Sequence, residues 1–204
     1  MCGIVGYIGS KQAYPILIEG LSTLEYRGYD SAGIAIVDGG QLKVHKDCGK
    51  VDHLKSLIEG KDVLGTIGIS HTRWATHGGP SKKNSHPHTD ENEMVAVVHN
   101  GIVENYSLIR DRLTKQGITF RSETDTEVLA HLISLYYQKD GDLAKAVRRA
   151  LTEVEGTFGL AVVAAGPAVA ETPAVPEPPP AAAKPKPIDT PELLDSLLGR
   201  LALA

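Results

Sequence analysis

Apolar residues recur along residues 2–163 with two spacings, one typical of strands and one typical of helices. Short apolar runs with polar flanks favour strands, whereas apolar positions three and four residues apart favour helices. The predicted strands cover residues 4–8, 33–37, 42–46, 65–70, 94–99 and 158–163. The predicted helices cover residues 13–24, 106–116, 126–137 and 143–154.

The order of these elements indicates an α/β or α+β sandwich, because strands flanked by helices must bury their apolar faces against other layers. Residues 33–37 and 42–46 are separated by Asp38-Gly39-Gly40, a sequence that permits the left-handed backbone of a tight hairpin turn. No internal repeat is present.

The pattern ends near residue 163. Nine of the twelve prolines lie between Pro167 and Pro191, and every aromatic residue lies at or before Phe158. We therefore expect a globular domain over residues 2–163 and a Pro/Ala-rich disordered linker over 164–189. Residues 190–204 should form a short amphipathic helix or a tail, since five leucines fall on one helical face: Leu193, Leu194, Leu197, Leu198 and Leu201.

The composition and charge of the chain exclude several classes of function. The 204 residues carry a formal net charge of −4, and 42% are apolar. A nucleic-acid partner is not expected, because such binding needs clustered Lys and Arg. No apolar run is long enough to predict a membrane span or a signal peptide. Cys2 and Cys48 provide no disulfide framework, so we expect a cytoplasmic protein.

Cys2 follows the initiator Met1, whose removal would make Cys2 the first residue. A free α-amine has a pKa of about 7.7–8.0, close to neutrality. That amine could take or relay the proton of the thiol, so nucleophile and base would lie on one residue. A second-position cysteine also occurs by chance and can be a small buried apolar residue.

A polar segment, residues 71–78, follows the strand predicted to end at Ser70. Its Arg73 has the planar fork that binds a carboxylate with two hydrogen bonds, and its single tryptophan, Trp74, could close a pocket. The alternatives are a surface loop with a packed Trp and a metal site of neighbouring histidines. The spacing of these histidines matches no common zinc pattern, so no metal and no cofactor is expected. The histidines are His71, His77, His86 and His88.

Two further segments carry candidate polar groups. Asn100 and Gly101 end an apolar strand, and a side-chain amide beside a glycine N–H could form an oxyanion hole. A plain Asn-Gly turn is the alternative. Asp125 lies in a carboxylate-rich helix start and could bind an ammonium group, while N-capping by Ser122 or Thr124 is the simpler explanation of that segment.

Together these groups suit an α-amino acid with a transferable acyl group, namely glutamine. The sequence at this point resembles the glutaminase domain of glucosamine-6-phosphate synthase, the isomerising glutamine–fructose-6-phosphate aminotransferase and a class II glutamine amidotransferase. The resemblance covers residues 2 to about 163, with six motifs in the family's order. These motifs are residues 2–9, 24–33, 71–78, 86–88, 98–105 and 122–127.

The resemblance implies a four-layer αββα sandwich of the N-terminal-nucleophile hydrolase type, shortened at its C-terminal end. It implies that Cys2 attacks the glutamine side-chain amide, releasing ammonia, and that water then hydrolyses the thioester. Asn100 and Gly101 would form the oxyanion hole. The substrate would be bound by Arg73, Thr76, His77 and Asp125. Trp74 would gate the ammonia exit, and the loop containing Arg27 and Tyr29 would close over the site.

Two departures from the family pattern shape the expected function. Family domains continue with further strands where this chain turns to proline and alanine at Ala164. The sugar-isomerase part that would accept the ammonia has no counterpart in residues 164–204. We therefore expect glutamine hydrolysis without full synthase activity, with a sugar-isomerase subunit or another acceptor protein as a possible partner. A non-catalytic fragment that binds glutamine or docks a partner is the alternative.

Overall fold

A computed structural model describes residues 2–61, 63–75 and 78–166, with only the backbone of Arg27. Thr76 and His77 lie outside these residues, as do residues 167–189 of the predicted linker and the whole predicted helix or tail 190–204. None of the described helices has the length and apolar character needed to cross a membrane.

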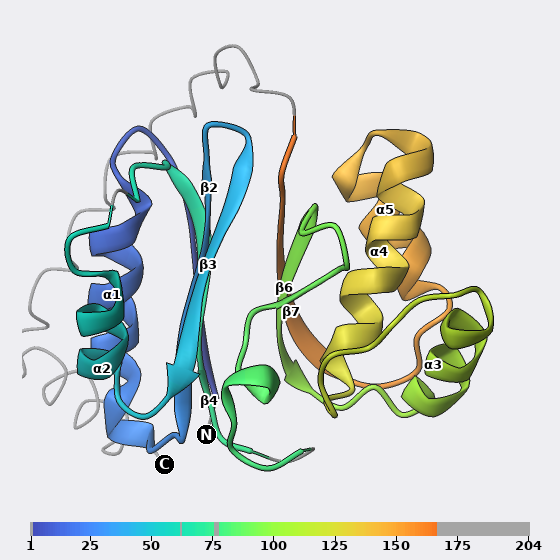
Figure 1. Cartoon of the computed structure of the whole chain (residues 1–204), viewed down its shortest axis with the longest axis horizontal. Coiled ribbons are helices and arrows are strands. Elements are labelled where there is room, and N and C mark those ends of the chain that lie inside the picture. Colours follow the sequence, from blue (N-terminus) through green and yellow to red (C-terminus); the bar gives the residue numbers. More distant parts are fainter. Residues whose placement is uncertain (1, 62, 76–77, 167–204) are drawn as a thin grey trace, which may run out of the picture. The chain divides into compact units, whose positions relative to one another are not determined.

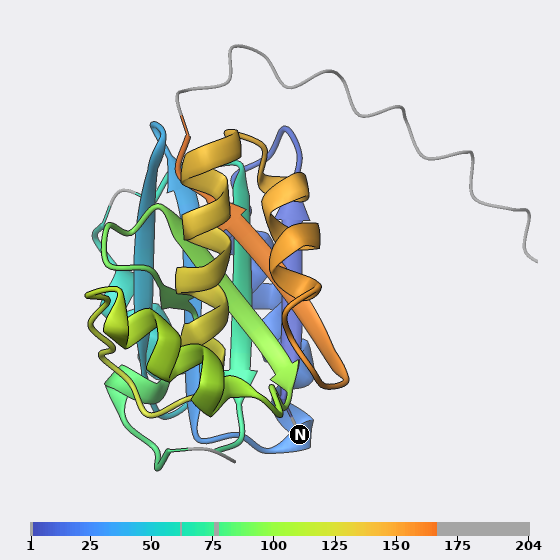
Figure 2. The same cartoon turned by 90° about the vertical axis from the view of Figure 1, so that its right-hand side faces the viewer.

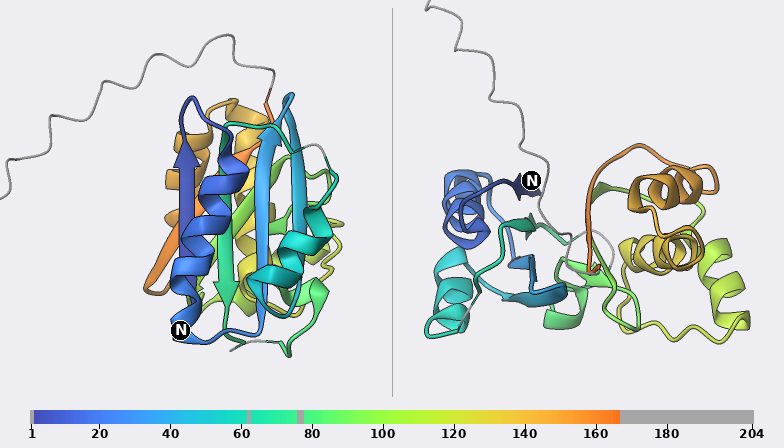
Figure 3. Two further views of the ribbon diagram at one scale, coloured as in Figure 1. Left: turned by 90° about the vertical axis from the view of Figure 1, so that its left-hand side faces the viewer. Right: turned by 90° about the horizontal axis from the view of Figure 1, so that it is seen from above.

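The first sheet is a four-stranded antiparallel sheet in the order β1-β4-β2-β3. Its strands are β1 (Gly3–Ile8), β2 (Ser31–Asp38), β3 (Gln41–Cys48) and β4 (Ile67–Arg73). Helices α1 (Ala13–Leu24) and α2 (Val51–Ile58) cover its outer face (Figures 1 and 3). The apolar pattern predicted α1 with its observed bounds, but it did not indicate α2, which is two turns long.

The second sheet has three strands, in the order β5-β6-β7. Its strands are β5 (His88–Thr89), β6 (Val95–Gly101) and β7 (Phe158–Ala164). Helices α3 (Tyr106–Lys115), α4 (Thr126–Asp140) and α5 (Leu143–Leu151) cover the face that points away from the first sheet (Figure 2). Short 3₁₀ turns occur as η1 (Glu25–Arg27) and η2 (Lys82–Asn84).

The inner faces of the two sheets pack against each other through small and branched apolar side chains. This inter-sheet layer is built around Ala35, Ile69, Ala96, Val98 and Val163. Two helical layers with two sheets between them form the αββα sandwich that the family resemblance implied (Figure 1). The layers follow from strand alternation, because each strand buries one set of residues between the sheets and the other set under helices.

Three strands extend beyond their predicted ends. Strand β4 continues through Arg73, since Thr72 pairs with Gly3 and Arg73 pairs with Ser31. Strand β6 continues through Gly101, and β7 includes Ala164, which was assigned to the linker. A prediction from the apolar pattern ends a strand where its side chains become polar. In the structure a strand ends later, because backbone hydrogen bonds continue wherever a neighbouring strand supplies partners.

Candidate active site

Four candidate polar side chains share the inter-sheet layer because of the pleat. Along β4, His71 and Arg73 follow at intervals of two residues after Ile69, which packs between the sheets. Along β6, Asn100 follows two residues after Val98, which also packs there. Cys2 is two residues before Ile4, another side chain of this layer. Because side chains two residues apart point to the same face, Cys2 joins the other three at one end of the sandwich.

The thiol of Cys2 lies beside the backbone of Trp74. The amide N–H of Trp74 donates to Sγ at 3.2 Å, and Sγ is 3.7 Å from the carbonyl oxygen of the same residue. The side-chain Nδ2 of Asn100 donates to the carbonyl oxygen of Cys2 at 3.4 Å. The structure therefore brings together Cys2, Trp74 and Asn100 from three separate sequence motifs.

His71 fixes the orientation of the Asn100 amide. Its Nε2 is 2.7 Å from Oδ1 of Asn100, and an amide oxygen only accepts hydrogen bonds, so Nε2 carries the hydrogen. Burial lowers the pKa of His71 to about 4, which keeps the ring neutral near pH 7. With Oδ1 engaged in this way, Nδ2 is left on the side of Cys2. The sequence analysis considered His71 only as one of the neighbouring histidines of a metal site.

Gly101 occupies a backbone position that excludes other residues. Its φ of +136° lies where L-residues are strained, and an added Cβ would lie 2.5 Å from the carbonyl oxygen of Thr157. Asn100 and Gly101 are thus the last residues of β6, paired with Gly159 and Phe158, and the alternative of a plain Asn-Gly turn is excluded.

Arg73 is 4% exposed, and its Nη2 donates to the carbonyl oxygen of Gly78 at 2.9 Å. The chain around it is held by Asp30. The backbone N–H of Asp30 donates to the Arg73 carbonyl oxygen at 2.8 Å, and Asp30 Oδ2 accepts from the N–H of Ala75 at 2.5 Å. Asp30 was not among the predicted site residues, although it lies in the family motif of residues 24–33, because its contacts with Arg73 and Ala75 join residues more than forty positions apart.

Asp125 is 5% exposed, and its Oδ2 accepts a hydrogen bond from the N–H of Val103 at 2.9 Å. This bond joins the start of α4 to the segment that follows β6. The predicted N-capping by Ser122 or Thr124 is wrong, since the residue before α4 is Asp125 and its side chain makes no cap. The Ser122 hydroxyl instead donates to Glu127 at 2.6 Å.

The predicted gating residues Trp74 and Tyr29 contact different parts of the structure. Trp74 is 53% exposed, and its ring lies against Gly28, where an added Cβ would be 3.3 Å from the indole. The Tyr29 hydroxyl donates to Glu25 and accepts from the N–H of Val51 at 2.7 Å. Its known bonds are thus to α2 and η1 rather than to Cys2. Nothing in the described chain places the side chains of Arg27, Thr76 or His77.

Buried histidines form a polar layer behind Asn100. The rings of His71 and His86 stack with centroids 4.2 Å apart, and His99 Nδ1 is 3.0 Å from the Thr126 hydroxyl. Burial lowers the pKa values of His86, His88 and His99 as well. Across the described residues, no group of three or more His, Cys, Asp or Glu side chains is arranged to hold a metal ion.

Two stacked antiparallel sheets between helical layers form a sandwich of the N-terminal-nucleophile type, with Cys2 where its first strand begins. Residues 71–168 match the model of a family described as "glutamine amidotransferase domain". The chain contains a glutamine amidotransferase domain of the kind found in glutamine–fructose-6-phosphate aminotransferases.

The similar proteins agree with this assignment. Over 163 residues the chain is 56% identical to the isomerising glutamine–fructose-6-phosphate aminotransferase of Clostridium tetani and 53% identical to that of Aquifex aeolicus. These matches cover 80% of this chain but only 26% and 27% of the two enzymes, so the chain spans about a quarter of its curated relatives. Among solved structures, a glutamine phosphoribosylpyrophosphate amidotransferase from B. subtilis is 30% identical, with a TM-score of 0.67. That match covers 80% of this chain and 35% of the other.

Proposed function

We propose that this domain hydrolyses the side-chain amide of glutamine, with Cys2 as the nucleophile. The observation that carries the proposal is the position of Cys2 between the backbone of Trp74 and the Asn100 amide, with Asn100 Nδ2 3.4 Å from the Cys2 carbonyl oxygen. A thiol beside an oriented N–H donor is the arrangement that acyl transfer requires.

Once Met1 is lost, Cys2 supplies both the nucleophile, its thiol, and the proton relay, its α-amine. Sγ forms a bond to the amide carbon of glutamine, and the thiol proton passes through the α-amine to the departing nitrogen. The carbon–nitrogen bond breaks and ammonia leaves. Water then attacks the resulting thioester, which restores the thiol and releases glutamate.

Asn100 and Gly101 are proposed as the oxyanion hole. The amide Nδ2 of Asn100 and the backbone N–H of Gly101 would donate to the oxygen that gains charge as Sγ adds. The hydrogen bond from His71 to Oδ1 supports this role, since it holds the Asn100 amide in the orientation that the reaction needs.

Substrate recognition is assigned to charged groups of opposite sign. We assign the glutamine carboxylate to Arg73 and the ammonium group to Asp125, both buried and both held by backbone contacts. Thr76 and His77 are assigned to the same pocket by their motif. Trp74 is assigned to the ammonia exit and the loop containing Arg27 and Tyr29 to closure over the site.

We further propose that the ammonia serves amino-sugar synthesis from fructose 6-phosphate. The support is the naming of the relatives as glutamine–fructose-6-phosphate aminotransferases, of which this chain matches about a quarter. The acceptor would then be a sugar-isomerase partner. Ammonia transfer to fructose 6-phosphate, measured with and without such a partner, tests this part of the proposal.

Glutamate release by the purified chain tests the hydrolysis itself. Mass spectrometry should first show that Met1 has been removed, after which a glutamine analogue with an electrophilic carbon should add once, at Cys2. Cys2→Ser should lose at least about two orders of magnitude in kcat, because the serine hydroxyl is a much poorer nucleophile than the thiolate.

Cys48→Ser is the matched control, because Cys48 is the only other thiol and is also partly buried. It should retain both turnover and labelling. A folded chain that begins at Cys2 and releases no glutamate contradicts the proposal, as does a Cys2→Ser variant with undiminished activity.

A further inference from the structure

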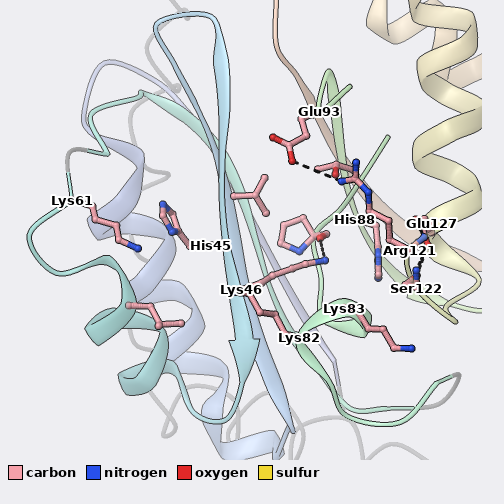
Figure 4. Close-up of a pocket in the computed structure, with 14 residues that line it drawn as sticks. His45, Lys46, Lys61, Lys82, Lys83, His88, Glu93, Arg121, Ser122 and Glu127 are labelled. Atoms are coloured by element: carbon pink, nitrogen blue, oxygen red, sulfur yellow. Dashed lines mark hydrogen bonds and ion pairs between the residues drawn. The ribbon is translucent and has the colours of Figure 1, made fainter. Parts of the chain in front are cut away.

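Away from the proposed active site, a pocket of about 520 Å³ lies at the edge of β3 and includes none of the proposed catalytic residues. Figure 4 shows His45 and Lys61 on one side of the strand and Lys46, His88 and Arg121 on the side facing the second sheet. Its volume is typical of sites for small molecules.

The pocket wall contains more cations than carboxylates. Five cationic side chains line it, whereas Glu93 and Glu127 are its two carboxylates. The cations are Lys46, Lys61, Lys82, Lys83 and Arg121. Because Lys83 is paired with Glu123 at 2.6 Å, the excess rests on the other four cations, in a chain whose net charge is −4.

The most buried of these cations is Lys46. Its ammonium group donates to the carbonyl oxygens of Ser85 and Pro87, each at 2.7 Å. An ammonium has three N–H donors, so one remains beyond these two bonds. No ion pair joins Lys46 to a carboxylate among the described residues. Burial lowers the pKa of Lys46 to about 8; the Glu127 carboxylate opposes this shift and Arg121 and Lys82 add to it, so Lys46 still carries its charge near pH 7.

The two carboxylates offset only part of this charge, and Glu127 is the one that acts on Lys46. Glu127 accepts from the hydroxyl and the N–H of Ser122, each at 2.6 Å, and from the N–H of Arg121 at 2.8 Å. Although burial opposes its ionisation, bonds from His131 and these groups hold its pKa at about 2. Glu93 is largely exposed and is 3.9 Å from Arg121, a weak surface pair.

We propose that this pocket binds the phosphate group of a small phosphate monoester, with Lys46, Lys82 and Arg121 as its cationic partners. A phosphate supplies the charge and the acceptor oxygens that the Lys46 ammonium lacks. The pocket is larger than a phosphate ion. Its remaining walls, which include Val44, Leu57 and Thr89, leave room for a sugar-sized group.

Titration of the isotope-labelled chain with glucose 6-phosphate, followed by amide NMR at constant ionic strength, tests this site. We expect saturable shifts at Lys46, Lys82 and Arg121, no such shifts with glucose, and displacement by inorganic phosphate. Binding is measured without glutamine and without turnover, so its outcome is independent of the proposed hydrolysis.

Two variants and a control locate the ligand. Lys46→Met should weaken binding about tenfold through loss of a charged hydrogen bond. Lys82→Ala should weaken it about threefold through loss of a partly exposed charge. Lys115→Ala is the control, because Lys115 is exposed on α3, outside the pocket.

The proposal is overturned if glucose 6-phosphate gives no saturable shifts or if glucose shifts the same amides. Should Lys46→Met fail to fold, Lys82→Ala decides the matter. A folded Lys82→Ala chain that binds glucose 6-phosphate as tightly as Lys115→Ala also overturns the assignment.

Discussion

The imidazole Nε2 of His71 lies 2.7 Å from the amide oxygen of Asn100. This contact crosses from β4 of the first sheet to β6 of the second, so it joins the two halves of the sandwich beside Cys2. It also determines which way the Asn100 amide faces, because Oδ1 is the acceptor and Nδ2 is the donor to the Cys2 carbonyl.

Loss of the His71 donor should therefore impair turnover more than glutamine binding. In His71→Phe the Asn100 amide loses the bond that orients it, and we expect kcat to fall about tenfold, less than the roughly 10²–10³-fold loss when an oxyanion-hole donor itself is removed. KM for glutamine should change little, because His71 is not assigned to the substrate. Steady-state glutamate release gives both constants.

His71→Gln provides the control, since its side-chain amide can donate to Asn100 Oδ1 without the imidazole ring. It should recover part of the lost kcat. If both variants lose turnover equally while remaining folded, orientation of Asn100 is not the role of His71.

Asp125→Asn should raise KM for glutamine about tenfold or more, because a charge-assisted bond to the ammonium group is lost. The asparagine oxygen can still accept from the Val103 N–H, so the fold should survive. Asp90→Asn is the control: Asp90 is also buried and accepts from the N–H groups of Met94 and Val95. Equal KM values for the two variants would contradict the assignment of Asp125.

Gly101→Ala should destabilise the chain by more than about 2 kcal/mol, since a strained backbone position costs 1–3 kcal/mol before any clash is counted. The added Cβ would also meet the Thr157 carbonyl oxygen at 2.5 Å. Gly159→Ala lies on the paired strand, where a Cβ meets no atom within 4 Å, and should be nearly neutral. Urea unfolding compares the two, and similar losses would refute this account of Gly101.

Stability should decrease as the pH falls below about 6.5. Burial lowers the pKa of His71 to about 4, so between these values the unfolded chain binds a proton that the folded chain does not. At pH 5 this costs about 2 kcal/mol for His71 alone. His86, His88 and His99 act in the same direction. Urea unfolding at pH 7.5 and at pH 5 measures the difference.

His88→Gln should reduce this acid sensitivity, because glutamine can bond to the Thr124 hydroxyl but does not titrate. His53→Gln, whose side chain on α2 is about half exposed, serves as the comparison and should keep the loss of stability that the buried histidines cause at pH 5. A His88→Gln chain with the full loss of stability at pH 5 would show that the buried histidines are not its cause.

Most elements were predictable because each carries its own apolar pattern. Helix α1 and the hairpin of β2 and β3 follow from local spacing and from the glycines at 39 and 40, both of which adopt positive φ. Helix α2 was missed because two turns give too few positions to establish a period. The ends of β4 and β6 were missed because polar site residues interrupt the pattern.

The sequence by itself determined most of the elements and the residue types of the site, since periodicity is a local property of the chain. The order of the layers was implied only by the resemblance of its motifs to the family. Only the tertiary structure decided which groups meet: His71 with Asn100, Asp30 with Ala75, and Asp125 with Val103. The basic pocket beside Lys46 likewise depends on tertiary structure. Such contacts join residues that are distant along the chain, and their geometry is set by strand register and sheet packing, which no local pattern records.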